Sequence, residues 1–172
     1  YSPHQHWMND PNGLIFNGGE YHHFYQYNPF GDQWGHISWG HAVSTDLVHW
    51  QELPVAIAED WRASIFAGSV VVDERNRAGF GGGAWVAIYT GCVGLPGGGR
   101  QAQELAFSHD RGRTWTKYMH NPVLDLGLRD FRAPKVFFHA GISRWVMLAA
   151  LPAERSVVFF TSHDLKVWSE TS

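Results

Sequence analysis

The feature that most constrains the fold is a short motif that occurs three times. Each copy has the order Ser-x-Asp, then three or four residues, then Trp. The copies span residues 44–50, 108–115 and 162–168, so their first residues lie 64 and 54 positions apart. An Asp at this place favours an Asx-type turn, after which the Trp begins or ends a strand. One turn repeated at such intervals predicts a chain built from equivalent units.

Runs typical of β-strands precede each copy. They read ISWGHAVS, QELAFS and SVVFFTS, and the earlier runs WVAIYTG and RWVMLAA are similarly rich in aromatic and β-branched residues. Helical periodicity is hard to find anywhere in the chain. The sequence therefore predicts an all-β fold, and repetition at this period favours a β-propeller of four-stranded blades. A single β-sandwich with similar hairpins is the alternative.

The number of units indicates an incomplete ring. Only about two and a half to three blades fit into 172 residues, whereas propellers have roughly four to eight. We therefore expect residues 1–172 to form only part of a propeller, either as a fragment or with blades supplied by a second chain. Self-association, or a complementary chain, would then complete the ring.

Composition excludes several classes of function. A net charge of −3 with scattered basic residues argues against binding to nucleic acid. No apolar run approaches the roughly 18 residues of a membrane span. The lone Cys92 rules out an internal disulfide framework. The histidines lack metal-binding spacing, so we expect no metal and no cofactor. The glycine-rich stretches 79–85 and 94–100 are predicted to be surface connections.

The stretch WMNDPNG supplies the first candidate for a catalytic group. Asn, Asp and Gly tolerate positive φ, and Pro fixes φ near the value that a turn needs. Such a turn could hold the carboxylate of Asp10 rigidly, with Asn9 placed to donate to a substrate hydroxyl. A purely structural Asx turn is the alternative, although Trp7 and Met8 are large apolar neighbours for a solvent turn.

Two further regions place polar groups among aromatic ones. In LRDFRAPKVFFH, residues 128–139, Arg132 suits a grip on paired hydroxyls or on a carboxylate. The alternative is an internal salt bridge between Asp130 and one of the arginines in this stretch. In residues 21–42, Gln26 and Asn28 interrupt an aromatic run. That pattern suits a wall that stacks on a sugar ring and binds its hydroxyls, and a strand with alternating faces is the alternative.

Five motifs in series resemble glycoside hydrolase family 32, which holds invertases, levanases and inulinases. They are WMNDPNG, FYQYNP, WGHAVSTDLVHW, IFAGSVVVD and DFRAPKVFF, and they cover nearly the whole chain in the right order. The resemblance implies a five-bladed β-propeller followed by a β-sandwich, and we expect residues 1–172 to form the N-terminal part of that propeller. It also implies retaining hydrolysis of β-fructofuranosides, such as fructans or sucrose, and a secreted or periplasmic protein.

The resemblance also implies a role for each matching residue. Asp10 would be the nucleophile, and Asn9 and Gln26 would bind the fructosyl unit. The other substrate-binding positions that it implies are Trp34, Phe66, Ser69 and Arg132. Ala67 stands where the family has the first Ser of its Phe-Ser-Gly-Ser segment.

Two departures from the family pattern lead us to expect an inactive or weak enzyme. Ala133 stands where the family has the Asp that stabilises the transition state. Losing that charged hydrogen bond should lower the rate by about 10²–10⁴. The second departure is that the sequence lacks the family's Glu-Cys pair, which supplies the acid/base, and Glu170 does not replace it.

Two other functions remain open from the sequence. One is a fructan-binding propeller fragment that binds fructosides without cutting them. The other is a sialidase-like propeller, because SHDRGRTW has the pattern of an Asp-box. The sequence does not distinguish β-2,1 from β-2,6 linkages, or exo from endo cleavage.

Overall fold

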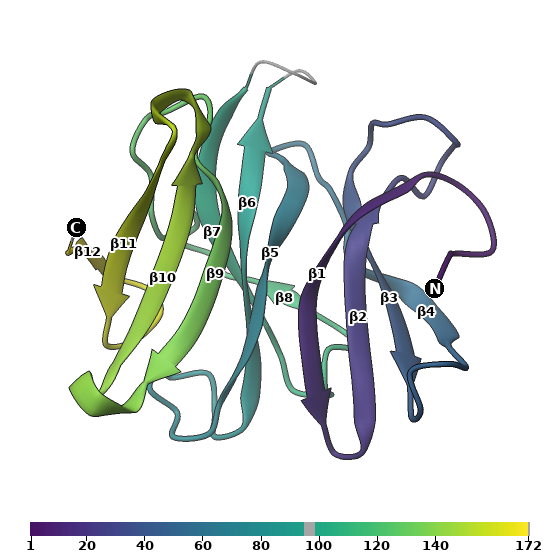
Figure 1. Ribbon diagram of the computed structural model, residues 1–172, viewed down its shortest axis with the longest axis horizontal. Helices are drawn as coiled ribbons and strands as arrows, with labels where there is room; N and C mark the ends of the chain where they lie inside the picture. The colour runs from purple at the N-terminus through teal and green to yellow at the C-terminus, as the bar shows by residue number, and fades with distance from the viewer. Residues whose placement is uncertain (95–98, 172) are drawn as a thin grey trace.

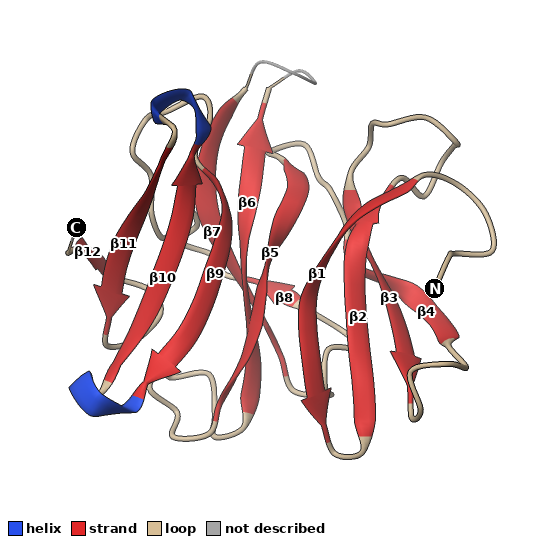
Figure 2. Cartoon of the chain, in the orientation of Figure 1, coloured by secondary structure: helices blue, strands red, loops and turns tan. Residues whose placement is uncertain are grey.

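The computed structural model describes residues 1–94 and 99–171, and it contains three four-stranded antiparallel sheets (Figures 1 and 2). The all-β prediction is confirmed. Of the two glycine-rich stretches, 94–100 lies largely outside the described residues. No helix among the described residues is long and apolar enough to cross a membrane.

Each sheet is a blade whose strands follow one another in chain order. The first blade contains β1 (Met8–Asn17), β2 (Glu20–Tyr27), β3 (Ser38–Ser44) and β4 (Gln51–Ile57). The second contains β5 (Ser64–Asp73), β6 (Ala84–Val93), β7 (Arg100–Ser108) and β8 (Thr116–Lys117). The third contains β9 (Arg132–His139), β10 (Arg144–Leu151), β11 (Ser156–Ser162) and β12 (Trp168–Glu170). Two short 3₁₀ turns, η1 (Ala140–Ile142) and η2 (Pro152–Glu154), connect strands of the third blade.

The blades are arranged as in a propeller. The first strand of each blade lies innermost, and β5 contacts both β1 and β9 (Figure 1). The polypeptide therefore brings the beginnings of three blades, which are far apart in the sequence, to one common axis.

The repeated motif forms the same turn in every blade, between the third and fourth strands. In the first copy the hydroxyl of Ser44 accepts the backbone N–H of Leu47, at 2.8 Å, and Asp46 Oδ1 accepts the N–H of Val48, at 2.9 Å. The indole of Trp50 donates to the carbonyl of Leu47, at 3.1 Å. The corresponding indole bonds in the other copies are Trp115 to Gly112, at 2.8 Å, and Trp168 to Leu165, at 3.0 Å. Asp46 and Asp164 form the predicted Asx-type turn, whereas Asp110 of the longer second copy accepts the N–H groups of Arg113 and Thr114.

The core lies between neighbouring blades. Phe24 and Trp39 of the first blade meet Trp85 and Tyr89 of the second. A second cluster joins the second and third blades; it includes Val86, Ile88, Leu105, Val136, Met147 and Phe160. Full burial of each such side chain contributes roughly 1.5–3 kcal/mol, so face-to-face contact between blades holds the arc together.

The two ends of the arc differ in how well they are covered. On the first blade, Tyr25 and Tyr27 face away from the core, and Tyr1 of the N-terminal segment covers Tyr25 with a hydroxyl–hydroxyl contact of 3.0 Å. On the third blade, Phe137 and Phe159 point away from the core and are partly exposed. The third blade therefore presents an open apolar face.

Candidate functional site

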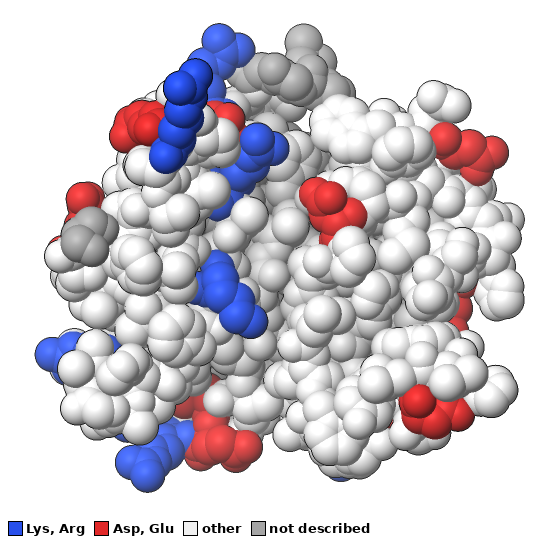
Figure 3. Space-filling model, in the orientation of Figure 1, with Lys and Arg blue, Asp and Glu red and all other residues white. Residues whose placement is uncertain are grey.

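A pocket of about 260 Å³ lies where the inner strands converge. Its lining residues are Asn9, Asp10, Gln26, Trp34, Phe66, Ala67, Arg132 and Ala133. The structure thus brings together seven of the eight site residues that the sequence predicted. Figure 3 shows that the surface is hollowed along the middle, between the blade that begins with β1 and the one that begins with β9.

Every blade contributes to this pocket through its first strand. Asn9 and Asp10 belong to β1, Phe66 belongs to β5, and Arg132 and Ala133 begin β9. Gln26 lies on β2 directly opposite Asn9 in the strand register. Trp34 comes from the connection between β2 and β3 and is 42% exposed at the pocket rim.

A local irregularity of β1 determines where Asp10 points. The register of β1 against β2 shifts between Asn9 and Pro11, and Asp10 has φ 41°. Asp tolerates this left-handed region better than most residues. A bulge of this kind re-aims a side chain relative to a regular strand, and here the carboxylate faces the pocket.

A chain of side-chain hydrogen bonds holds the carboxylate. Gln26 Nε2 donates to Asp10 Oδ2, at 3.3 Å, and Asn9 Nδ2 donates to Gln26 Oε1, at 2.9 Å. The indole of Trp7 in turn donates to Asn9 Oδ1, at 2.8 Å. Sequence reasoning noted Trp7 only as an apolar neighbour of the turn. Its role is to orient the Asn9 amide, and the WMND spacing was the available signal.

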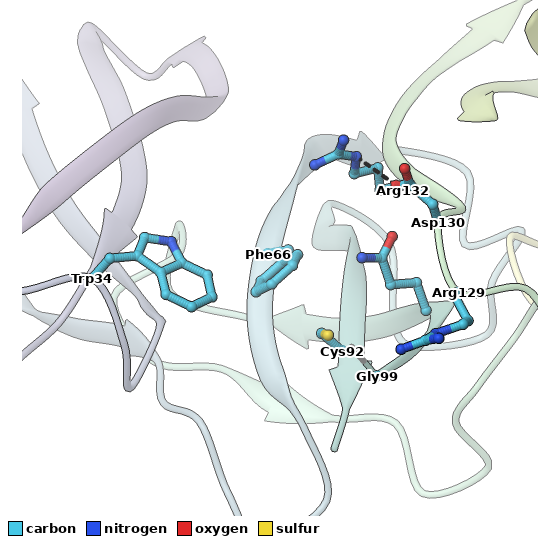
Figure 4. Close-up of a pocket in the computed structure, with 8 residues that line it drawn as sticks. Trp34, Phe66, Cys92, Gly99, Arg129, Asp130 and Arg132 are labelled. Atoms are coloured by element: carbon cyan, nitrogen blue, oxygen red, sulfur yellow. Dashed lines mark ion pairs between the residues drawn. The ribbon is translucent and has the colours of Figure 1, made fainter. Parts of the chain in front are cut away.

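Arg132 combines the two interpretations that the sequence left open. Its Nε lies 2.9 Å from Asp130 Oδ1, an ion pair that Figure 4 marks with a dashed line. Arg132 also lines the pocket that contains Asp10, whereas Asp130 lines an adjoining hollow of about 360 Å³. Trp34, Phe66 and Arg132 line both cavities. Burial raises the pKa of the Cys92 thiol, which lies in the adjoining hollow.

The backbone of Ala133 is fixed by buried polar groups of the second blade. Ala133 has φ 57°, and its N–H donates to Thr90 Oγ1, at 3.0 Å. Thr90 donates to Gln103 Oε1, at 2.9 Å, and Gln103 Nε2 donates to the carbonyl of Phe131, at 2.8 Å. Thr90 and Gln103 are completely buried. No sequence motif pointed to these two residues, because their partners lie far along the chain.

Ser69 is the one predicted site residue outside the pocket. Its hydroxyl donates to the carbonyl of Pro134, at 2.8 Å, and accepts the N–H of Val136, at 3.1 Å. The side chain lines a neighbouring hollow of about 280 Å³. Ser69 therefore joins β5 to β9, the strand that carries Arg132.

Asp10 is the only carboxyl group among the described residues that line the pocket. Asn9, Gln26 and Arg132 surround it with amide and guanidinium donors, and Trp34 and Phe66 add apolar ring surface. This combination suits a neutral, hydroxyl-rich ring and offers one nucleophilic oxygen. The described residues contain no group of three or more His, Cys, Asp or Glu arranged to hold a metal ion.

Known proteins match the chain along its whole length. Residues 1–172 match the family described as the glycosyl hydrolases family 32 N-terminal domain. A levanase of Bacillus subtilis is 49% identical over 176 residues, which is all of this chain and 25% of the levanase.

Solved structures agree with this match. The crystal structure of an exo-inulinase from Aspergillus awamori covers all of this chain with a TM-score of 0.93 and 40% identity, and the match spans 38% of that enzyme. A fructofuranosidase from Schwanniomyces occidentalis complexed with fructose has the same TM-score and 42% identity, and the match spans 35% of it. The chain therefore spans about a quarter to two fifths of the length of these relatives.

Proposed function

The chain belongs to glycosyl hydrolase family 32, and on that premise we propose that its pocket binds and cleaves β-fructofuranosides such as fructans or sucrose. The observation that carries the proposal is the position of Asp10. Its carboxylate lies in one pocket with Asn9, Gln26 and Arg132, beside the ring of Trp34.

In the proposed reaction Asp10 attacks the anomeric carbon of a fructosyl unit. The bond to the leaving oxygen breaks as the ester to Asp10 forms, and a water molecule later hydrolyses that ester with net retention. Gln26 holds Oδ2 of Asp10, so Oδ1 is the attacking atom. Arg132 and Asn9 bind ring hydroxyls, and Trp34 and Phe66 stack against the ring.

The leaving oxygen must also receive a proton from a carboxylic acid. Asp10 is the only carboxyl group that the described residues place in the pocket, so these residues supply the nucleophile and not the acid. The methyl group of Ala133 accepts no hydrogen bond from the sugar. We therefore propose that the chain is a weak enzyme. These two observations equally favour the second candidate, a domain that binds fructosides without cutting them.

A substitution at residue 133 tests the proposal. Ala133→Asp should raise fructose release from sucrose, inulin or levan by about 10²–10⁴, because a carboxylate there would stabilise the transition state. Asp is also suited to the left-handed backbone of this position. Fructose release should be measured enzymatically, with linear initial rates on each substrate.

The control is Asp10→Asn, alone and combined with Ala133→Asp. Both Asn variants should release no fructose, because the nucleophile is gone. Equal release with and without the Asp10 carboxylate would contradict its role. Measurable fructoside binding with no release from Ala133→Asp would favour the binding domain.

The relatives also support two coarser proposals. We propose that the natural ligand is a fructan or sucrose, and that the protein is secreted. An extracellular exo-inulinase is among the relatives, 41% identical over 197 residues. The Asp-box pattern, which suggested a sialidase-like propeller, serves here as the hairpin turn of each blade.

A further inference from the structure

The largest exposed aromatic side chain lies beside a second hollow, outside the pocket that contains Asp10. Trp61 is 93% exposed. It lines a hollow of about 660 Å³, more than twice the volume of the pocket with Asp10. Trp34 lines both of these cavities and is the contact between them. An occupant of the Asp10 pocket can therefore extend past Trp34 toward Trp61.

The turn that carries Trp61 is held in place from both sides. Asp60 Oδ1 accepts the N–H of Arg62, at 2.8 Å, which closes the turn around Trp61. Lys117 Nζ lies 2.7 Å from Asp60 Oδ2, and Arg62 Nη2 donates to the carbonyl of Asn121, at 3.0 Å. Both of these contacts attach the turn to the second blade. The indole is thus presented to solvent by an anchored segment, which lowers the entropy cost of binding a ligand there.

The charged groups of this hollow are already paired. Burial acts to raise the pKa of Asp60, but hydrogen bonds from Lys117 and from backbone N–H groups lower it below its usual value. Glu59 Oε1 lies 2.6 Å from His36 Nδ1, and Glu59 Oε2 accepts the hydroxyl of Ser64, at 3.2 Å. Two carboxylates and one guanidinium leave the lining without a positive excess. The hollow therefore favours a neutral, hydroxyl-rich ligand over an anion.

The position of Trp61 also argues against burial by another blade. The turn connects β4 of the first blade to β5 of the second, and the hollow contains residues of both blades. The open face of the arc lies on the third blade, where Phe137 and Phe159 point outward. A further blade placed on that face would not reach the junction between the first two blades.

From these observations we propose that the hollow beside Trp61 binds a second part of an extended substrate. One or two sugar units of a β-fructan chain would lie across Trp34 and stack on the indole of Trp61, while the terminal fructosyl unit occupies the Asp10 pocket. This inference rests on the proposed function and makes it more specific. It assigns the chain to oligomeric fructans in preference to sucrose.

The test compares a short with a long ligand in the Asp10→Asn background, where no cleavage competes with binding. Calorimetric titration should use sucrose and two fructan tetrasaccharides, one linked β-2,1 and one β-2,6. One aromatic stack is worth about tenfold in affinity. At least one tetrasaccharide should therefore bind about tenfold more tightly than sucrose.

Substitutions at residue 61 then attribute this gain to the indole. Trp61→Ala should abolish most of the gain and leave the sucrose affinity within about twofold, whereas Trp61→Phe should retain most of it. The matched control is Phe16→Ala, at an exposed aromatic residue near the C-terminal end of β1 that lines neither cavity. Because Trp61 is almost fully exposed, its removal should not impair folding, which a thermal scan verifies.

Three results would overturn the inference. The first is equal affinity for sucrose and both tetrasaccharides. The second is that Trp61→Ala weakens the binding of sucrose and of the tetrasaccharides equally. The third is that Trp61→Ala lowers the oligomeric mass measured by light scattering while tetrasaccharide binding stays unchanged. The last result would assign Trp61 to contact with a second copy. Failure to bind any fructoside would refute the proposed function itself, and with it this inference.

Discussion

A hydroxyl group in the second blade controls the backbone geometry at one edge of the pocket. Thr90 accepts the N–H of Ala133 and donates to Gln103; Thr90 and Gln103 are completely buried, whereas the bond to Ala133 is partly buried. Buried donors and acceptors that lose their partners each cost roughly 1–3 kcal/mol. Thr90 is therefore a positioning residue for the strand that carries Arg132.

Replacing Thr90 by Val should destabilise the protein by about 1–3 kcal/mol, because the shape is kept while the buried Gln103 side-chain oxygen loses its donor and the N–H of Ala133 loses its acceptor. Thr90→Ser keeps the hydroxyl and should cost clearly less. Urea unfolding followed by tryptophan fluorescence measures both. A larger loss of stability in Thr90→Ser than in Thr90→Val would show that the methyl group matters more than the hydrogen bonds.

At the scale of elements, two buried histidines join neighbouring strands of the first blade, β2 and β3. His22 of β2 and His41 of β3 are hydrogen-bonded to each other, Nδ1 to Nε2, at 3.0 Å. Burial lowers the pKa of His22 to about 4 and that of His41 to about 3. In the unfolded chain both would titrate near 6.5. The fold therefore requires both rings to be neutral.

This pair should make the protein sensitive to acid. Above pH 6.5 neither state binds the extra protons, so the stability is fully present. As the pH falls from about 6.5 toward 4, the unfolded chain takes up protons that the fold excludes, and stability falls by about 1.4 kcal/mol per pH unit for each histidine. Urea midpoints between pH 4 and 8 measure this slope.

A His22→Gln variant should have a shallower slope than the wild type, although it is less stable at neutral pH. His4→Asn is the matched control, because His4 is exposed and should leave the slope unchanged. An identical slope in all three proteins would show that other groups cause the acid sensitivity.

The elements were more predictable from sequence than the site's supporting contacts. The repeated turn depends on residues within one heptapeptide or octapeptide, so its hydrogen bonds can be inferred from spacing alone. The resemblance to family 32 is confirmed, and it placed Asp10, Gln26 and Arg132 in motifs that the fold brings to one pocket. Their roles in catalysis remain proposals.

Contacts between distant segments could not be inferred in this way. Thr90 meets Ala133 across 43 positions, and no local pattern records such a pair. Ser69 matched its motif, but its hydroxyl donates to the backbone of β9. This contact depends on how the second and third blades pack together, which the local sequence does not reveal. Trp61 carries no motif at all, and only the anchored turn indicates its use.

At the scale of the whole molecule, the open face of the third blade exposes apolar side chains from two of its strands. Phe159 is 38% exposed there, beside Phe137 and Val157 on the same side of the sheet. Contiguous apolar surface of this kind marks association sites. We propose that the purified chain self-associates through this face.

Light scattering should show a mass above that of the single chain, 19.4 kDa, that increases with concentration. Phe159→Lys should shift the chain toward the monomer, because a charge on this face opposes burial. Val167→Lys is the control, since Val167 is exposed on the β11–β12 turn. A single-chain mass at all concentrations would refute self-association.

The convergence of β1, β5 and β9 has a consequence for the order of folding. Each blade is built from strands that are neighbours in the sequence. The cavity around Asp10 exists only after three blades have docked, because Asn9 and Arg132 are more than a hundred residues apart in the sequence. Contacts of such long range form late and slowly. The ability to bind a sugar would therefore be the last property that the folding chain acquires. A bound fructoside would contact all three blades and so stabilise their docking.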